Sequence, residues 1–315
     1  KLVRRDDRRK GGIHHTPQDL ISYMVNSSLK LVDCKNPVLC DLAVGAGAFL
    51  ISGVREIHEQ TDIPIRDLFE HCTIGFDVDS KVLKVAAYCI HIAAGCPDLP
   101  LNIHLYSGDS LKGRNSRQRI QQKISNSFVD LDKRQLIFIG NPPYVRVKQE
   151  EYQKYGLDSH KCGNLSAYML EQIAKLSNKG DIISQVVPIS IVHSAKTISI
   201  RKILQQHCQS IEILAFDCVP GYMFDQGKIG SNSSTSITQR VAVLNSIIGE
   251  PLKSVKSSRY IRWQGEERNS LFSQIKTLVI DKKFFSEYQW PVLGEYEEKK
   301  MFSLMNKSER TIGDL

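Results

Sequence analysis

The feature that most constrains the fold of this chain is the alternation of short apolar runs with longer amphipathic segments between residues 37 and 248. Short apolar runs bounded by turn residues are typical of buried strands, and segments with apolar side chains at helical spacing are typical of helices. Strands that alternate with helices in this way form a parallel sheet with helices on both faces. We therefore predict an α/β fold with a doubly wound, mostly parallel sheet.

The expected elements have definite places in the chain. Thr16 and Pro17 predict the start of the first helix, because a hydroxyl side chain caps a helix and proline favours its first position. The predicted strands cover residues 37–42, 72–76, 103–106, 135–139, 181–187, 211–216 and 241–248, and the predicted helices cover residues 17–32, 47–59, 81–94, 117–124, 164–176 and 195–206. The carboxyl ends of parallel strands meet at one edge of the sheet, where ligands bind.

Charge and cysteine usage narrow the class of protein. The 42 Lys and Arg residues exceed the 34 Asp and Glu residues, which gives a net charge of +8. The excess is uneven, because residues 111–160 carry a net +5 and residues 11–110 a net −6, and this favours a polyanionic partner. The eight cysteines form no C-x-x-C pair, so we expect reduced thiols in a cytoplasmic protein and no metal site. We expect no membrane segment, because no apolar run is long enough.

The alternation of strands and helices stops after residue 250, and the composition there becomes polar around Trp263 and Trp290. We therefore predict one domain over residues 1–250 and the start of a second domain over residues 251–315. A polar loop at residues 230–238 precedes the last predicted strand.

The first predicted strand ends in a motif suited to a cofactor. Asp41 is followed by Gly45 and Gly47, which open the next predicted helix. Glycines permit a tight turn and a close approach of the backbone to a ligand. A dinucleotide site would require a third glycine at position 50, which is Leu50. A carboxylate beside such a turn instead fits a ligand with a cationic amino-acid end, such as S-adenosylmethionine.

Acidic residues also follow the next two predicted strands. Asp77 is placed to accept hydrogen bonds from ribose hydroxyls, whereas Asp79 is expected to cap the following helix. Asp109, after the third strand, is placed to accept a hydrogen bond from the adenine amino group of a cofactor.

The most specific motif is Asn141-Pro142-Pro143-Tyr144, which follows the apolar strand at residues 135–139. The side-chain oxygen of Asn141 and the carbonyl of Pro142 can each accept one hydrogen from an exocyclic NH₂ group of a base. The two prolines stiffen the loop and remove competing N–H donors. Tyr144 can stack on the face of the base.

In their order along the chain, these motifs resemble those of DNA methyltransferases that make N6-methyladenine in restriction–modification systems, in the arrangement with the cofactor motif before the catalytic motif. The resemblance covers about residues 10–250 and implies a Rossmann-like methyltransferase fold with S-adenosylmethionine as cofactor. The catalytic residues that it implies are Asn141, Pro142, Pro143, Tyr144 and Phe224. The cofactor-binding residues that it implies are Thr16, Pro17, Asp41, Ala43, Gly45, Gly47, Phe49, Asp77, Asp109, Leu111 and Asn141.

The resemblance also implies a partner and a reaction. Double-stranded DNA supplies an adenine that must leave the base stack before its N6 can be reached. Arg146 and Lys148, directly after the catalytic loop, are then candidates for phosphate contacts. Family members carry a target-recognition domain after the catalytic one, so residues 251–315 are expected to be the start of a truncated recognition domain. A restriction or specificity protein is a further expected partner.

Three other functions remain open on the residues alone. Methyltransferases that act on the amide of a protein glutamine also use Asn-Pro-Pro-Tyr, because a planar NH₂ group poses the same chemical problem. An adenine in RNA is another possible substrate. A non-catalytic DNA-binding specificity subunit with a methylase fold is a hypothesis of a different class.

Overall fold

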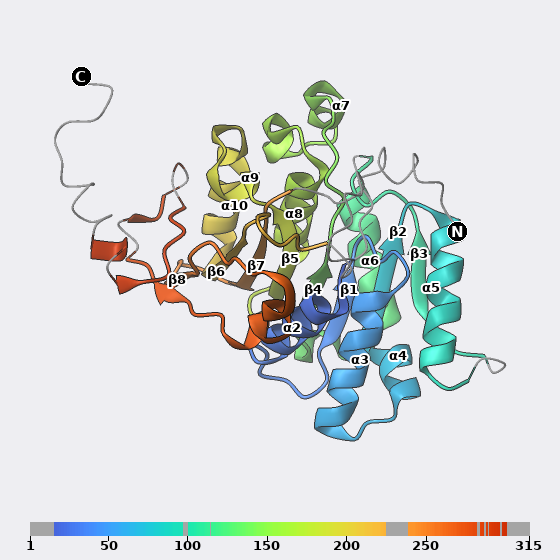
Figure 1. The fold of residues 1–315 in the computed structure, drawn as a ribbon. Helices are drawn as coiled ribbons and strands as arrows, with labels where there is room; N and C mark the ends of the chain where they lie inside the picture. Colours follow the sequence, from blue (N-terminus) through green and yellow to red (C-terminus); the bar gives the residue numbers. More distant parts are fainter. Residues whose placement is uncertain are drawn as a thin grey trace.

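A nine-stranded sheet forms the centre of the computed structural model, which describes residues 16–96, 100–113, 115–224, 239–281, 284–286, 288, 290–296 and 298–300 (Figure 1). The strands are β1 Val38–Asp41, β2 Thr73–Asp77, β3 His104–Ser107, β4 Leu136–Gly140, β5 Ile182–Pro188, β6 Cys208–Phe216, β7 Val241–Ile248, β8 Ser254–Ser257 and β9 Leu278–Val279. Their order across the sheet is β3-β2-β1-β4-β5-β7-β6-β8-β9.

The first five strands of this order pair in parallel, and β7 is antiparallel to both β5 and β6. The chain winds from β1 to β2 and β3 in one direction and then returns to β4 on the other side of β1. The winding direction thus reverses between β1 and β4, and doubly wound folds bind their ligands beyond the carboxyl ends of the strands at such a switch point. The predicted fold class is therefore confirmed.

Helices cover both faces of the sheet. They are α2 Gln18–Leu29, α3 Ala48–Thr61, α4 Ile65–Cys72, α5 Ser80–Ala93, α6 Ser116–Ser127, α7 Gln149–Gln153, α8 Leu165–Leu176, α9 Ser190–His193 and α10 Ile198–His207, with 3-10 turns η1 Leu131–Lys133, η2 Asp158–Cys162, η3 Ala195–Thr197 and η4 Gly265–Ser273. Helices α2 to α5 pack on the face that carries Leu39 and Ile137, and α6, α8 and α10 pack on the face that carries Cys40 and Phe138. None of the helices in the described ranges is long and apolar enough to cross a membrane.

The sheet continues beyond residue 250, where the sequence predicts a domain boundary. Strand β8 pairs in parallel with β6, with Ile211 opposite Val255, and β9 pairs with β8. Trp263 and Trp290, which lie in this polar region of the sequence, are both buried. Without β8, the outer edge of β6 would present unpaired backbone groups to solvent. The described part of residues 251–300 thus covers an edge of the same sheet.

All eight cysteines are free thiols, and Cys40, Cys72, Cys96, Cys162 and Cys208 are buried. No group of three or more His, Cys, Asp or Glu side chains within the described ranges could hold a metal ion.

Candidate active site

The loops after β1, β2, β3 and β4 bring the sequence-predicted motifs to one edge of the sheet. The glycine turn after β1 departs from regular backbone geometry, since Gly45 and Gly47 have φ values of +55° and +84°. L side chains rarely adopt such angles, which explains both glycines. Gly47 is the N-cap residue of α3, and among the described residues an added Cβ at Gly45 would meet nothing closer than the Ala43 carbonyl at 4.0 Å. The turn therefore leaves room beside the backbone at the start of a helix.

Asp41, the last residue of β1, is buried, and its carboxyl group lies against Gly140 at the end of β4. Its Oδ1 accepts a hydrogen bond from the Ala43 backbone N–H at 2.9 Å. An added Cβ at Gly140 would lie 2.8 Å from the same oxygen, so the glycine that precedes Asn141 makes space for this carboxyl group. Burial raises the pKa of Asp41 to about 7; the Ala43 N–H opposes this shift and the charge of Asp77 adds to it. A cation bound beside Asp41 would favour its ionised form.

The side chain of Asp77 connects the loops after β1 and β2 by hydrogen bonds. Its Oδ2 accepts from the Gly45 N–H at 3.0 Å, and its Oδ1 accepts from the Asp79 N–H at 3.0 Å. Asp79 caps α5 through the Lys81 N–H, as predicted. Asp109 bonds its own turn, because its Oδ1 accepts from the N–H groups of the two residues at 111 and 112.

The catalytic loop contacts the start of α2. The side-chain NH₂ of Asn141 donates to Thr16 Oγ1 at 3.1 Å. The expectation that Thr16 caps α2 is wrong: Pro17 is the N-cap residue and makes no side-chain cap hydrogen bond. The Asn141 Oδ1 atom is buried and has no hydrogen-bond partner among the described residues. A buried acceptor of this kind costs free energy unless a donor reaches it, so this oxygen is a candidate acceptor for a ligand.

The two aromatic residues of the predicted catalytic set lie together. The rings of Tyr144 and Phe224 have centroids 6.1 Å apart and an interplanar angle of 57°. Burial raises the pKa of Tyr144 well above its ordinary value, so its hydroxyl stays protonated at neutral pH. Phe224 lies in the loop that follows β6, 80 residues away from Tyr144 in the sequence.

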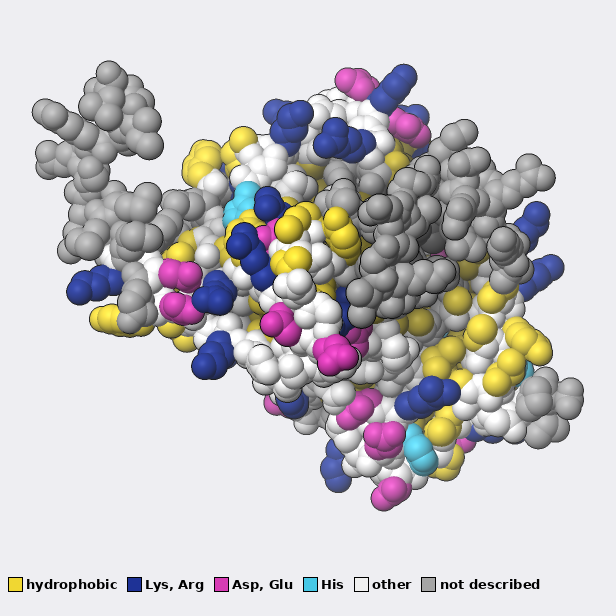
Figure 2. Space-filling view, viewed as in Figure 1, with side chains coloured by type: hydrophobic (Ala, Val, Ile, Leu, Met, Phe, Trp, Pro, Cys, Tyr) yellow, Lys and Arg dark blue, Asp and Glu magenta, His cyan; other side chains and the backbone are white. Residues whose placement is uncertain are grey.

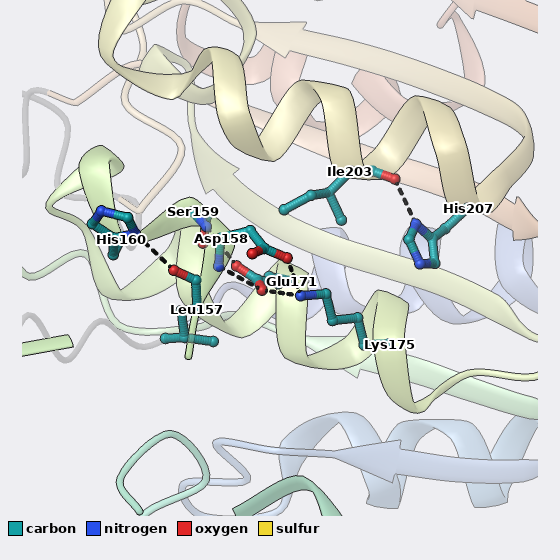
Figure 3. A network of polar contacts seen from close by, with 8 residues as sticks. All are labelled: Leu157, Asp158, Ser159, His160, Glu171, Lys175, Ile203 and His207. Carbon is teal, nitrogen blue, oxygen red and sulfur yellow. Dashed lines mark hydrogen bonds and ion pairs between the residues drawn. The ribbon is translucent and has the colours of Figure 1, made fainter. Parts of the chain in front are cut away.

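The segment after the catalytic loop is anchored by α8 and η2. Asn164 caps α8 by accepting from the Ser166 N–H, and Ser166 Oγ lies 2.6 Å from Asn164 Oδ1 and 3.4 Å from the Pro143 carbonyl oxygen. The fully buried Glu171 of α8 accepts from two N–H groups at the start of η2 and pairs with Lys175, as Figure 3 shows. The loop that carries the predicted catalytic residues therefore leads into a rigidly bonded segment.

The remaining predicted residues have different environments. Phe49 and Leu111 pack in the hydrophobic core on opposite faces of the sheet. Arg146 and Lys148 are exposed after the catalytic loop, and the backbone of Arg146 forms a bridge with Asn164. The loop at residues 230–238 lies outside the described residues.

One residue that contacts this region was not found from the sequence. Arg268 of η4 pairs with Asp19 of α2 and donates to the carbonyls of Tyr222 and Met223, which directly precede Phe224. No local pattern marks Arg268, because its partners lie up to 249 residues away in the chain.

Known proteins resemble both the sequence and the fold. Residues 72–220 match the family model of the Eco57I restriction-modification methylase. Among curated proteins, none matches this sequence. The predicted resemblance to restriction–modification methylases is thus confirmed over those residues.

Three solved structures share the fold at low sequence identity. The ATP-dependent Type ISP restriction-modification enzyme LlaBIII bound to DNA superposes with a TM-score of 0.62 at 14% identity, over 88% of this chain and 22% of that one. A modification subunit of a putative type I restriction enzyme from Vibrio vulnificus YJ016 gives 0.61 at 13% identity, over 93% and 61%. A putative class I S-adenosylmethionine-dependent methyltransferase from Listeria monocytogenes gives 0.50 at 16% identity, over 76% and 64%. The chain therefore spans less than two thirds of each of these proteins, and the shared feature is the methyltransferase fold.

Proposed function

We propose that this chain is the catalytic part of a DNA methyltransferase that transfers a methyl group from S-adenosylmethionine to N6 of an adenine rotated out of the duplex, in a restriction–modification system. The observation that carries the proposal is the buried, unpaired Oδ1 of Asn141 at the carboxyl end of β4, next to the switch point of the sheet. The family match over residues 72–220 supports the same reaction class.

The chain's own residues suit this cofactor. No described residue closely approaches the glycine turn at Gly45, and the carboxyl group of Asp41, four residues earlier, is buried. Asp41 would hold the cationic amino group of the cofactor, which would shift the pKa of about 7 downward and release a proton on binding near neutral pH. Asp77 has both carboxylate oxygens aligned by backbone N–H groups and would accept from ribose hydroxyls with its remaining lone pairs. Asp109 would neighbour the adenine.

On the substrate side, Asn141 Oδ1 and the Pro142 carbonyl would each accept one hydrogen of the N6 amine. No described residue donates to the Pro142 carbonyl, so both acceptors are available. Two acceptors that pull on both N–H bonds favour a tetrahedral nitrogen, whose lone pair can attack. The bound cofactor supplies an electrophilic methyl group, and the proton of N6 can leave after transfer. Positioning is then the main contribution of the protein.

The aromatic pair would hold the extruded base. Tyr144 and Phe224 present two faces at 57° to each other, and stacking on one such face contributes about 1–3 kcal/mol. That gain offsets part of the cost of removing a base from the stack.

The test replaces Asn141 by Ala and measures transfer of tritiated methyl groups to duplex DNA that contains adenine. We expect transfer to fall by at least about a hundredfold, the order expected when a group that aligns the reactants is lost, while cofactor binding by calorimetry persists. The matched control is Asn126→Ala, which removes an exposed asparagine on α6 that bonds nothing in the described structure. Full activity of Asn141→Ala, or methylation of RNA or a protein glutamine in place of DNA, would refute the proposal.

The whole protein's partners follow from the same proposal. Its DNA contacts would include Arg146 and Lys148, and a restriction or specificity protein would assemble with it. Residues 251–315 would be the start of a target-recognition domain.

A further inference from the structure

A buried carboxylate at the carboxyl end of β6 holds two exposed arginines. The Asp217 side chain is only 2% exposed. Its Oδ1 accepts from Arg240 Nε at 2.7 Å and its Oδ2 from Arg262 Nε at 2.6 Å. The two arginine side chains are 51% and 65% exposed. Among the described residues, no acceptor meets the Nη groups of either arginine. In the part of the chain that the structure describes, each guanidinium is thus anchored by Nε and its two Nη groups have no acceptor.

Neighbouring side chains order this cluster further. The Arg240 guanidinium lies 5.8 Å from the centre of the Tyr260 ring, and the Tyr260 hydroxyl bonds His193 Nε2 at 2.7 Å. Burial raises the pKa of Asp217, but hydrogen bonds from Arg240, the Cys218 N–H and Arg262 outweigh it and hold the pKa below its ordinary value. One carboxylate against two guanidinium groups leaves a net charge of +1.

The cluster lies at the same edge of the sheet as the catalytic loop. Arg240 directly precedes β7, whose first residue pairs with Pro188 and Phe216 at the carboxyl ends of β5 and β6. Three inter-strand steps separate β6 from β4, or about 14 Å at the usual spacing. Figure 2 shows several Lys and Arg side chains on the part of this face where Figure 1 places α10, β6 and β8.

We propose that Arg240 and Arg262 form a preorganised site for a backbone phosphate of duplex DNA, beside the base held at the β4 loop; this rests on the proposed function. Paired Nη groups match the oxygens of a phosphate in a bidentate geometry, which lysine cannot reproduce. Because Asp217 already holds both side chains and Tyr260 also contacts Arg240, less conformational entropy is lost on binding. The contact positions the duplex and reads no sequence.

The test measures binding of a fluorescent duplex oligonucleotide by anisotropy at several salt concentrations, with Arg240→Gln, Arg262→Gln and the double variant. Because the two arginines share one phosphate, the double change should make the slope of log K against log salt shallower by about 1, and each single change should make it shallower by no more than that. The matched control is Arg66→Gln, an exposed arginine of α4 that is paired with Glu70, at the opposite edge of the sheet. Unchanged slopes in the Arg240 and Arg262 variants, or an equal change in Arg66→Gln, would overturn the proposal.

Two further measurements distinguish a bidentate phosphate contact from general attraction between a basic surface and DNA. Arg262→Lys keeps the charge and loses the paired Nη groups, so it should keep the salt slope and still bind several-fold more weakly; wild-type affinity would contradict a bidentate contact. Cofactor binding should be unchanged in all variants, which also reports that they are folded.

Binding to DNA is measured without methyl transfer, so an inactive wild-type chain that still binds through these arginines would refute only the proposed reaction. A wild-type chain that binds no duplex would refute the phosphate site.

Discussion

Arg268 connects the region after residue 250 to the start of α2 and to the loop that carries Phe224, and its replacement by Gln should destabilise the protein. Its Nε lies 2.7 Å and its Nη2 3.1 Å from the two oxygens of Asp19, a bidentate pair. Nη1 and Nη2 also donate to the carbonyls of Tyr222 and Met223 at 3.1 and 3.0 Å. The guanidinium lies 5.5 Å from the centre of the Trp263 ring.

The magnitude follows from these contacts. The Arg268 side chain is 18% exposed and that of Asp19 is 35% exposed, so water screens the ion pair only in part. A hydrogen bond from a charged donor contributes about 1.5–3 kcal/mol when buried, and an exposed ion pair less than about 1 kcal/mol. The hydrogen bonds to the two carbonyl groups contribute near the lower end of that range, and the ion pair with Asp19 is partly screened. We therefore expect the free energy of unfolding to fall by roughly 3 kcal/mol.

Equilibrium urea unfolding, followed by tryptophan fluorescence, is a suitable assay, because the chain has two tryptophans and one of them contacts Arg268. A double-mutant cycle with Asp19→Asn isolates the pair, for which we expect a coupling of about 1 kcal/mol or more. Arg66→Gln serves as control and should change the free energy by less than about 0.5 kcal/mol. A loss below about 1 kcal/mol in Arg268→Gln, with additive effects in the cycle, would refute the reasoning.

Two further predictions concern buried carboxyl groups. Replacing Glu171 by Ala should lower the free energy of unfolding in urea by about 3 kcal/mol, because two N–H groups of η2 lose their acceptor and Lys175, 19% exposed, keeps only Asp158 as a partner among the described residues. A loss below about 1 kcal/mol would contradict this. Asp41 has a folded-state pKa raised to about 7, so it binds a proton more tightly in the folded state, and its contribution to stability is present at acidic pH and lost as the pH rises from about 4 to 7. As the pH rises over this range, the free energy of unfolding of Asp41→Asn should therefore increase by a few kcal/mol relative to that of the wild type. Urea unfolding at each pH measures this difference, and a difference that does not vary with pH would contradict the prediction.

The parallel half of the sheet was predictable from the sequence because each of its strands is a short apolar run followed by a polar turn. The prediction for residues 135–139 matches β4 within one residue, and the prediction for residues 241–248 matches β7. The antiparallel direction of β7 was not predictable, since a strand buried on both faces is apolar throughout in either direction. Helix α4 was missed because it is only eight residues long and leads directly into β2 without a turn.

The site was predictable only where its residues are contiguous. Asn141 to Tyr144 form one motif, and the loop that follows the strand defines their place. Thr16 shows the limit of local reasoning: a hydroxyl residue before proline predicts a helix cap, yet its hydroxyl meets Asn141, 125 residues later. Residue type and spacing cannot distinguish a helix cap from a contact with Asn141, because the Thr16 hydroxyl can form a hydrogen bond in either role.

The polar composition after residue 250 has a similar explanation. This polar composition predicted a separate domain because the alternation of strands and helices stops there. Without the residues after 250, however, the sheet would have an uncovered edge at β6. Strand β8 covers that edge, and Arg262 and Arg268 supply the cations that Asp217 and Asp19 require. Residues that cover an edge and pair with buried charges need not be apolar, so composition alone does not report that they belong to the sheet. The described residues 254–279 therefore complete the same sheet that places the loops after β4 and β6 at one edge, and the proposed catalytic and phosphate sites both depend on them.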